Sequence, residues 1–316
     1  MRLQTKMSRI GLTCALLVVV VLLSPTVAAP PGGGGGKPPA TPADPAIAFV
    51  SGGDDVVVMN ADGTNKATVL SAALVYDLSW SPDAKQLAIT PGNTNNRGVY
   101  VLDVAVVNGV PQGSNLRQIV ACWCATVAWS PLGSEIAYMR QSGVTKTVEA
   151  VPASGGTPQV IYTSVGGDLR HVTWSSDGTR IAFIQAEAAD NSERSIKIVE
   201  RLSGTVTHTL LQGQYYLQGL DWARGGVDAL AFHNGAEDPT RIYTVDIGTG
   251  VVTPVITARL CGYPSWSPDN TKLVYCVRTS NGNVQYLQTV SLSTGQTQTL
   301  TSTKNGWAWA PDWRRF

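Results

Sequence analysis

The stretch Trp266-Ser267-Pro268-Asp269-Asn270, followed by the apolar residues 273–277, decides the fold of this chain because it recurs along the sequence. Close versions of it begin at Trp80, Trp129, Trp174, Trp222 and Trp309, so the unit returns every 43 to 49 residues. A period of that length, with short apolar runs and turn residues inside each unit, is typical of the blades of a β-propeller.

Each unit predicts four short strands. The first strand ends in the tryptophan, as in residues 127–129, and the second is an apolar run, as in residues 136–138. The third and fourth strands flank a glycine-containing turn, as in residues 293–295. Four strands are the content of one propeller blade. Residues 46–316 hold six such units, so we predict an all-β, six-bladed β-propeller of four-stranded blades.

The Ser-Pro-Asp-Gly pattern has a structural explanation as a tight turn. Proline has its φ angle already set, and glycine or asparagine tolerates the left-handed conformation that closes the hairpin. Gly133, Gly178 and Asn270 suit that position, whereas Ala84 and Trp313 do not, and there we expect a different turn. We expect the six tryptophans to pack between neighbouring sheets; the alternative is a platform for stacking a ligand.

The two ends of the repeat array complement each other. Residues 46–50 match the second strand of a blade that lacks a first strand, and residues 307–312 match a first strand and turn whose blade is unfinished. We therefore predict that the last blade is closed by both termini. Such closure removes the sheet edges that would otherwise invite aggregation.

The N-terminal region predicts export. Arg2, Lys6 and Arg9 precede an apolar run over residues 10–23 and small residues up to Ala28, which is the pattern of a secretory signal peptide over residues 1–28. An uncleaved anchor is the alternative, but the run is shorter than the roughly 20 residues that a spanning helix needs. Residues 29–45, rich in glycine and proline, are predicted to be a disordered tether. The propeller follows over residues 46–316, and we expect a periplasmic or secreted protein.

The charge of the chain argues against some classes of partner. Without the signal peptide, 20 basic and 22 acidic residues give a net charge of −2. Nucleic-acid-binding proteins carry a basic excess or a basic stripe, so we expect no nucleic-acid partner. We also expect no membrane insertion after cleavage of the signal, and a monomer.

The Trp-Ser-Pro-Asp-(Gly/Asn) hairpins, with following strands such as Ile181-Ala182-Phe183, resemble the WD40-like repeats of the TolB-type six-bladed propellers over residues 46–316. The resemblance implies a role in the bacterial envelope through binding of a lipoprotein. In that family an α/β domain precedes the propeller, whereas here we expect the tether to lead directly into it. Similar propellers precede the hydrolase domain of prolyl-oligopeptidase-like enzymes, but the sequence shows neither that domain nor a Gly-x-Ser-x-Gly nucleophile elbow.

A binding face is predicted from the strand order. The Ser-Pro-Asp turns share one face of a propeller, and the connections between blades share the opposite face, where ligand sites are expected. The binding candidates on that face are Trp123, Asp168, Arg170, His171, Tyr215, Tyr216, Arg259 and Tyr263. We predict a non-enzymatic binder of a protein or peptide partner. The alternative is a lyase or hydrolase acting on a glycan or peptide, using Asp168, Arg170, His171 and Glu237. With only three histidines, we expect no metal and no cofactor.

Four cysteines remain after the signal peptide. Cys261 and Cys276 fall toward the same end of one predicted hairpin, so a disulfide between them is geometrically plausible. Cys122 and Cys124 would then form a local bridge. Reduced cysteines and a zinc site are the alternatives, the latter disfavoured by the one-residue spacing and the lack of a nearby histidine pair.

Overall fold

A computed structural model describes the propeller residue by residue. The described residues are 46–52, 54–71, 74–92, 97–164, 166–187, 193–234, 241–257, 260–279, 285–302 and 306–315. The predicted signal peptide and tether lie outside them.

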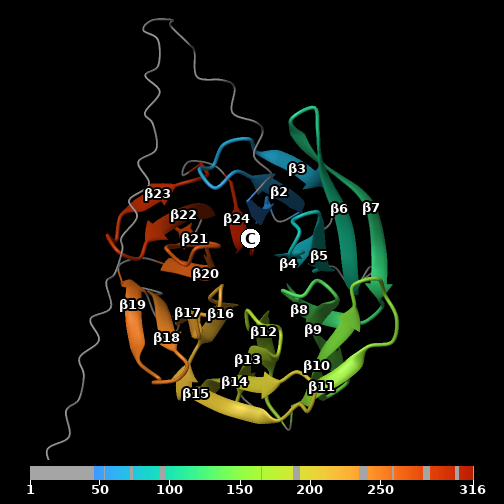
Figure 1. Cartoon of the computed structure of the whole chain (residues 1–316), viewed down its shortest axis with the longest axis vertical. Helices are drawn as coiled ribbons and strands as arrows, with labels where there is room; N and C mark the ends of the chain where they lie inside the picture. The colour runs from blue at the N-terminus through green and yellow to red at the C-terminus, as the bar shows by residue number, and fades with distance from the viewer. Residues whose placement is uncertain are drawn as a thin grey trace, which may run out of the picture. The chain divides into compact units, whose positions relative to one another are not determined.

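Twenty-four strands form six four-stranded sheets arranged around a central channel (Figure 1). From the channel outward, blade 1 comprises β24 (Ala308–Trp313), β1 (Ile47–Ser51), β2 (Asp55–Met59) and β3 (Ala67–Leu70). Blade 2 comprises β4 (Val75–Trp80), β5 (Gln86–Pro91), β6 (Val99–Val107) and β7 (Val110–Val120). Blade 3 comprises β8 (Trp123–Trp129), β9 (Glu135–Ser142), β10 (Thr145–Pro152) and β11 (Gln159–Thr163).

Blade 4 comprises β12 (Leu169–Trp174), β13 (Arg180–Ala186), β14 (Glu193–Glu200) and β15 (Val206–Tyr215). Blade 5 comprises β16 (Leu217–Trp222), β17 (Ala229–Asn234), β18 (Arg241–Asp246) and β19 (Val252–Ile256). Blade 6 comprises β20 (Leu260–Trp266), β21 (Lys272–Arg278), β22 (Gln285–Ser291) and β23 (Thr297–Thr299). The predicted six-bladed, four-stranded architecture is confirmed. Within the described ranges, no helix is long and apolar enough to cross a membrane.

Closure by both termini is also confirmed. The C-terminal strand β24 pairs antiparallel with the N-terminal strand β1, with Ile47 opposite Trp313 and Ser51 opposite Ala308. The inner strand of blade 1 therefore comes from one end of the propeller sequence and the outer three strands from the other. This arrangement joins the two ends through a ladder of backbone hydrogen bonds.

One tryptophan from each inner strand packs against the preceding blade. Six apolar clusters lie at the six junctions, and each contains one of the side chains Trp80, Trp129, Trp174, Trp222, Trp266 and Trp313. None of the six is more than 5% exposed. Truncating a buried side chain of this size costs about 3–5 kcal/mol. The tryptophans thus hold the blades together, as the prediction for the first five stated.

The sixth belt tryptophan is Trp313, four residues after the predicted Trp309. Trp313 lies opposite Ile47 in the ladder, just as Trp80 lies opposite Leu87, whereas Trp309 is only partly buried. The predicted turn after Trp309 is part of strand β24. The error arose because Trp309-Ala310-Pro311-Asp312 resembles the repeated Trp-Ser-Pro-Asp stretch in letters while occupying a different place in the strand.

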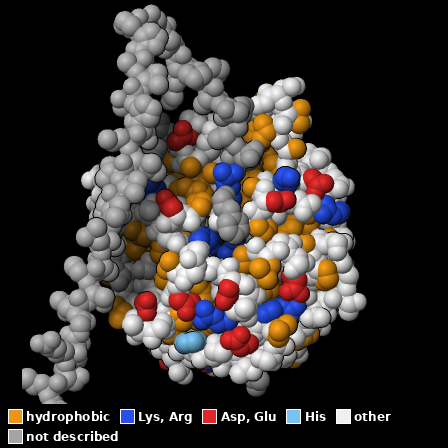
Figure 2. Space-filling model, viewed as in Figure 1, with side chains coloured by type: hydrophobic (Ala, Val, Ile, Leu, Met, Phe, Trp, Pro, Cys, Tyr) orange, Lys and Arg blue, Asp and Glu red, His pale blue; other side chains and the backbone are white. Residues whose placement is uncertain are grey.

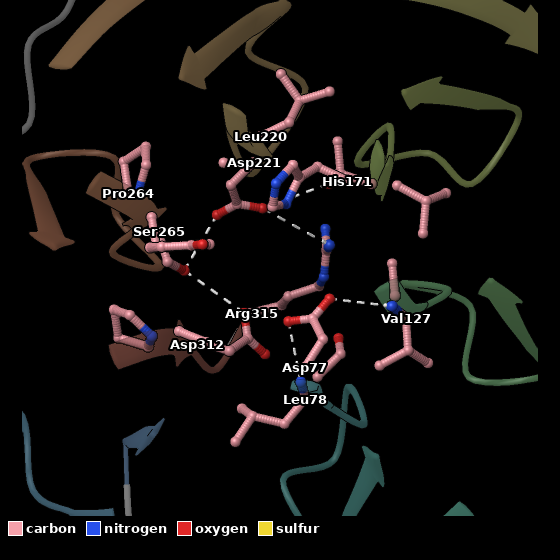
Figure 3. Close-up of a pocket in the computed structure, with 18 residues that line it drawn as sticks. Asp77, Leu78, Val127, His171, Leu220, Asp221, Pro264, Ser265, Asp312 and Arg315 are labelled. Carbon is pink, nitrogen blue, oxygen red and sulfur yellow. Dashed lines mark hydrogen bonds and ion pairs between the residues drawn. The ribbon is translucent and has the colours of Figure 1, made fainter. Parts of the chain in front are cut away.

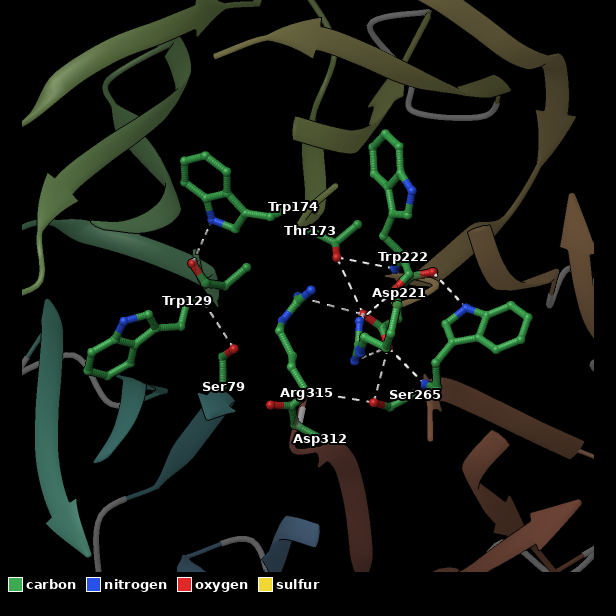
Figure 4. Close-up of polar contacts among 12 residues, drawn as sticks. Ser79, Trp129, Thr173, Trp174, Asp221, Trp222, Ser265, Asp312 and Arg315 are labelled. Atoms are coloured by element: carbon green, nitrogen blue, oxygen red, sulfur yellow. Dashed lines mark hydrogen bonds and ion pairs between the residues drawn. The ribbon is translucent and has the colours of Figure 1, made fainter. Parts of the chain in front are cut away.

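A ring of hydrogen bonds joins the inner strands beside the tryptophans (Figure 4). At five junctions the tryptophan backbone N–H donates to the side chain that precedes the tryptophan of the preceding blade. The pairs are Trp129 to Ser79 (3.0 Å), Trp222 to Thr173 (3.3 Å), Trp266 to Asp221 (2.9 Å), Trp313 to Ser265 (3.0 Å) and Trp80 to Asp312 (2.7 Å). At the sixth junction the position is Ala128, and the Trp174 indole donates to its carbonyl instead (3.0 Å). We call this ring the tryptophan belt.

The turns after the belt differ from the prediction at one position. Gly133, Gly178 and Asn270 have φ of 79°, 71° and 56°, as predicted. Ala84 has φ of 56° and donates its N–H to Ser81 in the same way, so the expected different turn is wrong. The side chain of Asp83 explains this, because it accepts hydrogen bonds from the Ser81 hydroxyl and the Lys85 N–H and fixes the turn.

Of the two expected disulfides, the structure contains Cys122–Cys124 and lacks Cys261–Cys276. Cys261 lies opposite Val277, and Cys276 lies opposite Gly262, so the two cysteine side chains point to opposite faces of blade 6. No disulfide joins them. Cys122 and Cys124 do form a disulfide, with their Cα atoms 5.3 Å apart. Alternation of side chains along a strand therefore excludes the pairing that the hairpin ends alone had indicated.

Candidate functional site

At the ends away from the tryptophan belt, the inner strands form a channel mouth with an irregular backbone. Three residues before the tryptophan, His171, Tyr263 and Ala310 have φ of 48°, 54° and 46°, and Gly219 has φ of 50°. The strand register shifts beside His171, Gly219 and Tyr263. Bulges of this kind re-aim side chains, and non-glycine residues with positive φ cluster at functional sites. The mouth therefore differs in kind from the regular tryptophan belt.

A pocket of about 340 Å³ opens at the mouth beside blades 2, 3 and 4. Four of the predicted binding residues line it together: Trp123, Asp168, Arg170 and His171. They come from the beginnings of β8 and β12 and from the residue before β12. The pocket lies away from the Ser-Pro-Asp turns, so the predicted face is the one that carries it.

Ionic contacts fix the polar wall of the pocket. Asp168 binds the Lys146 ammonium at 2.7 Å and the Arg170 guanidinium at 2.9 Å. Arg140 lies 3.7 Å from Glu149, whose carboxylate also accepts a hydrogen bond from the Tyr138 hydroxyl. The cations are therefore held in place before any ligand arrives, which lowers the ordering cost of binding.

Aromatic side chains also line the pocket. Trp123 is 56% exposed, and the Arg97 guanidinium stacks on its ring. The Cys122–Cys124 disulfide flanks this tryptophan on both sides in the sequence and limits its backbone freedom. Tyr76, 45% exposed, also lines the pocket. A large apolar surface thus remains open beside the fixed cations.

An arc of rings continues from the pocket around the channel. Tyr76 contacts Trp309 at 6.3 Å between ring centroids, and Trp309 contacts Tyr263 at 5.8 Å. Tyr263 in turn contacts His171 at 5.7 Å and His233 at 5.2 Å. The structure thereby connects the predicted residue Tyr263 to the pocket through His171. Trp309, misassigned to the scaffold, belongs to this aromatic arc.

The two histidines of the arc are neutral near physiological pH. Burial lowers the pKa of His171 to about 3, and repulsion from His233, Arg170 and Arg194 adds to this effect. Burial and Arg194 lower the pKa of His233 to about 3 as well. The Tyr263 N–H donates to Nδ1 of His233 at 3.2 Å, which requires that nitrogen to be unprotonated.

Glycine makes room for the His233 ring. A Cβ atom on Gly219 would lie 2.6 Å from Nδ1 of His233, and one on Gly262 would lie 3.1 Å from the same ring. Gly219 therefore has no room for a side chain unless the His233 ring moves, and Gly262 leaves little room for one. The close packing fixes His233 and, through its hydrogen bond, the strained backbone of Tyr263.

A narrower cavity of about 60 Å³ lies deeper in the channel (Figure 3). Asp77 accepts hydrogen bonds there from the N–H groups of Val127 and Leu78, both at 3.0 Å. Burial raises the pKa of Asp77 to about 7, and burial with the nearby Asp221 charge raises the pKa of Asp312 to about 6. Arg315 reaches into this space, where its Nη2 lies 3.9 Å from Asp221. The cavity joins the mouth to the tryptophan belt.

The remaining predicted residues lie outside the pocket. Tyr216 is 45% exposed at the connection between blades 4 and 5, with Arg194 near its ring. The backbone of Tyr215 ends β15, and its side chain is not among the described ones. Arg259 and Glu237 lie outside the described residues. None of these four is brought to the pocket by the described contacts.

Several pocket residues were missed by reasoning from the sequence. Arg140, Lys146 and Tyr76 lie near strand ends, at the end of β9 and the beginnings of β10 and β4. Counting back from each tryptophan to the beginning of its strand would have located Tyr76. No comparable signal marks the other two, since their meeting depends on strand lengths. Among the described residues, no group of three or more histidine, cysteine or acidic side chains is placed to hold a metal ion.

Six four-stranded sheets around a channel with a pocketed mouth define the class of protein, a six-bladed β-propeller. Within that class, residues 46–316 match the family model of the TolB beta propeller domain, and the chain belongs to this family. No curated protein sequence matches the chain significantly.

Solved structures share the fold at low sequence identity. TolB from Acinetobacter baumannii is similar with a TM-score of 0.69 and 20% identity; the match covers 85% of this chain and 66% of TolB, just under two thirds. A protein of Agrobacterium tumefaciens assigned as TolB gives a TM-score of 0.61 and 17% identity, over 85% of this chain and 97% of that protein. An oligogalacturonate lyase in complex with manganese gives 0.53 and 17%, over 82% and 73%. At these identities the likeness concerns the fold alone.

Proposed function

We propose that the protein is an exported, non-enzymatic propeller that binds a protein or peptide partner through its channel mouth. The observation that carries this proposal is the pocket of about 340 Å³, which is lined by an exposed tryptophan and by cations that Asp168 holds in place. Tryptophan, tyrosine and arginine are the residues that dominate binding energy at protein interfaces. The fold by itself leaves function open, so the proposal rests on this site.

The electrostatics of the mouth favour binding over catalysis by Asp168, Arg170 and His171. A general base or acid works best with a pKa near the operating pH, whereas the pKa of His171 is lowered to about 3. Asp168 is already engaged by Lys146 and Arg170. Asp168, Lys146 and Arg170 therefore support a rigid binding wall better than a proton-transfer site.

Export and monomeric state complete the proposal. The signal-peptide pattern of residues 1–28 supports a periplasmic or secreted location, and membership of the TolB propeller family is consistent with it. On the face drawn in Figure 2, basic and acidic side chains are interspersed, which supports a partner other than nucleic acid. We propose that a monomer presents the mouth to its partner.

A second candidate function is an enzyme acting on a glycan or peptide. The observation that favours it is the pKa of Asp77, raised to about 7 by burial at the edge of the narrow cavity. A carboxyl group with such a pKa suits general acid–base chemistry. One protein of similar fold is an oligogalacturonate lyase. Turnover of polysaccharides or peptides that Asp77→Asn abolishes would favour this candidate.

Partner capture tests the first proposal. Purified protein would be immobilised and exposed to an envelope extract, with Trp123→Ala and Tyr216→Ala as variants of the mouth face. Leu132→Ala is the matched control, since Leu132 is an equally apolar side chain, 68% exposed, in a turn at the other face. We expect the mouth variants to lose the captured partner and the control to keep it. Capture that only Leu132→Ala removes would place binding on the turn face.

A further inference from the structure

Positive charge is concentrated around the mouth pocket. Arg97, Arg140, Lys146 and Arg170 line it, and Asp168 is the carboxylate among the lining residues. With Glu149 behind Arg140 also counted, four cations stand against two carboxylates. The whole chain has a net charge of only +1. The excess at the pocket is therefore local rather than a general property of the protein.

The charge of Arg170 is only partly compensated, because Arg170 shares the Asp168 carboxylate with Lys146. The Nε atom of Arg170 is buried and has no hydrogen-bond partner within the described structure. Burial lowers the pKa of Arg194, and repulsion from Arg170 lowers it further. A bound anion beside Arg170 would offset the repulsion between the two arginines. The pocket is thus built for a negatively charged group.

We propose that the mouth pocket selects an acidic peptide segment. Arg170 and Arg140 bind its carboxylates, and Trp123 packs against a neighbouring apolar side chain of the peptide. This inference rests on the proposed function and narrows it from any peptide to one carrying carboxylates beside an apolar residue. Arginine suits this role because its planar guanidinium binds a carboxylate through two parallel hydrogen bonds.

The lining favours an acidic peptide over an acidic sugar. Sugar hydroxyls donate hydrogen bonds and need acceptors, yet both oxygens of Asp168 are engaged by Lys146 and Arg170. Stacking of a sugar ring needs an open indole face, and Arg97 covers one face of Trp123. An apolar side chain packs equally well on the exposed remainder of that indole. Donors and apolar surface together match carboxylates and a hydrophobic side chain.

The experiment measures the affinities of three labelled nonapeptides by fluorescence anisotropy. They share a Gly/Ser background and a central phenylalanine, and differ in two flanking positions that hold Glu, Gln or Lys. We expect the Glu peptide to bind about tenfold tighter than the Gln peptide, and the Lys peptide to bind weakest. The advantage of the Glu peptide should shrink as salt is raised, since exposed charges are screened.

A matched pair of substitutions tests the named arginine. Arg170 and Arg117 each bind one aspartate, at 2.9 and 3.0 Å, with side chains 35% and 33% exposed, but Arg117 lies on the outer strand β7. We expect Arg170→Gln to weaken the Glu peptide about tenfold or more and Arg117→Gln to change it less than about twofold. Arg140→Gln, on a more exposed side chain, gives the same test if Arg170→Gln lowers the yield of folded protein.

Three outcomes would overturn the inference. Equal binding of the Glu and Gln peptides, with both lost in Trp123→Ala, would remove the acidic preference and leave peptide binding at the mouth intact. Displacement of the Glu peptide by oligogalacturonate at lower concentration than by unlabelled Glu peptide would assign the site to an acidic glycan. Absence of binding by all three peptides would also overturn it, and partner capture from the extract would then decide the proposed function separately.

Discussion

The two ends of the inner strands, the tryptophan belt and the mouth, differ in hydrogen bonding, backbone conformation and exposure. At the tryptophan belt, five of six junctions repeat one hydrogen bond, and every belt tryptophan is at most 5% exposed. Only a few residues away, at the mouth, the same strands carry bulges, positive φ angles and exposed aromatic rings. A repeated, hydrogen-bonded end supports a varied and strained end. Rigid elements of this kind are what hold a binding site to precise geometry.

Trp313→Ala and Trp309→Ala give the largest expected difference between the belt and the mouth. Trp313 is 5% exposed in the belt, whereas Trp309 lies partly buried in the aromatic arc of the mouth. We expect Trp313→Ala to lower the free energy of unfolding by about 3–5 kcal/mol, because it empties a junction between blades. Trp309→Ala should cost less than about half of that. Urea unfolding of both variants measures the difference, and an equal loss would return Trp309 to the scaffold.

The pH dependence of stability separates the buried groups of the channel. The pKa of Asp77 is raised from 3.8 to about 7, so the folded protein keeps this proton to higher pH than the unfolded chain. The stability linked to Asp77 is therefore fully present below about pH 4 and is lost as the pH rises to about 7. For His171 and His233, with pKa lowered from 6.5 to about 3, stability is present above about pH 6.5 and is lost as the pH falls toward 3.

Asp77→Asn isolates the part of the pH-dependent stability that is linked to Asp77. Asparagine stands in for the protonated carboxyl, so the variant should gain stability relative to the natural protein between pH 4 and pH 8, by about 2–4 kcal/mol. Asp54→Asn, at an exposed position in the turn between β1 and β2, serves as the control and should show no such gain. Unfolding curves at the two pH values give the result. A parallel response of the two variants would mean that Asp77 ionises normally in the folded protein.

Completing the tryptophan belt is the smallest expected effect. Ala128 is the one belt position without a side-chain oxygen, and Ala128→Ser would place a hydroxyl where the Trp174 N–H can donate to it. We expect a gain of about 0.5–1.5 kcal/mol in the free energy of unfolding, the net worth of one hydrogen bond. The control is Ala137→Ser, since Ala137 is buried directly opposite Ala128 but outside the belt. A loss of stability in both variants would show that the junction is too tight for a hydroxyl.

The scaffold could be predicted from the sequence because each of its parts is repeated. Ser267-Pro268-Asp269 and its relatives mark the turns, and the interval between tryptophans sets the size of a blade. The exception is instructive: Trp309 carried the right letters but Trp313 occupies the position in the ladder. Similarity of letters located the repeat to within four residues, and hydrogen-bond register decided the rest.

The mouth could be predicted only in part. Trp123, Asp168 and Arg170 lie at or just before the beginnings of inner strands, which the strand order assigns to one face. Arg140 and Lys146 lie in the eight-residue strands β9 and β10, and nothing in the sequence fixes how far those strands run. The Cys261–Cys276 pairing likewise failed because the two cysteines occupy opposite faces of their blade. Features that rest on register and strand length need the structure.

Hydrogen exchange of the protein with and without its bound partner or peptide tests the central claim most directly. Binding at the mouth predicts slowed amide exchange in residues 123–126 and 168–171, where the pocket is lined. The turn segments 130–134 and 175–179, at the other end of the same blades, should exchange at unchanged rates. Slowed exchange in those turns, with residues 123–126 and 168–171 unaffected, would contradict the claim and move the binding face to the tryptophan-belt end of the propeller.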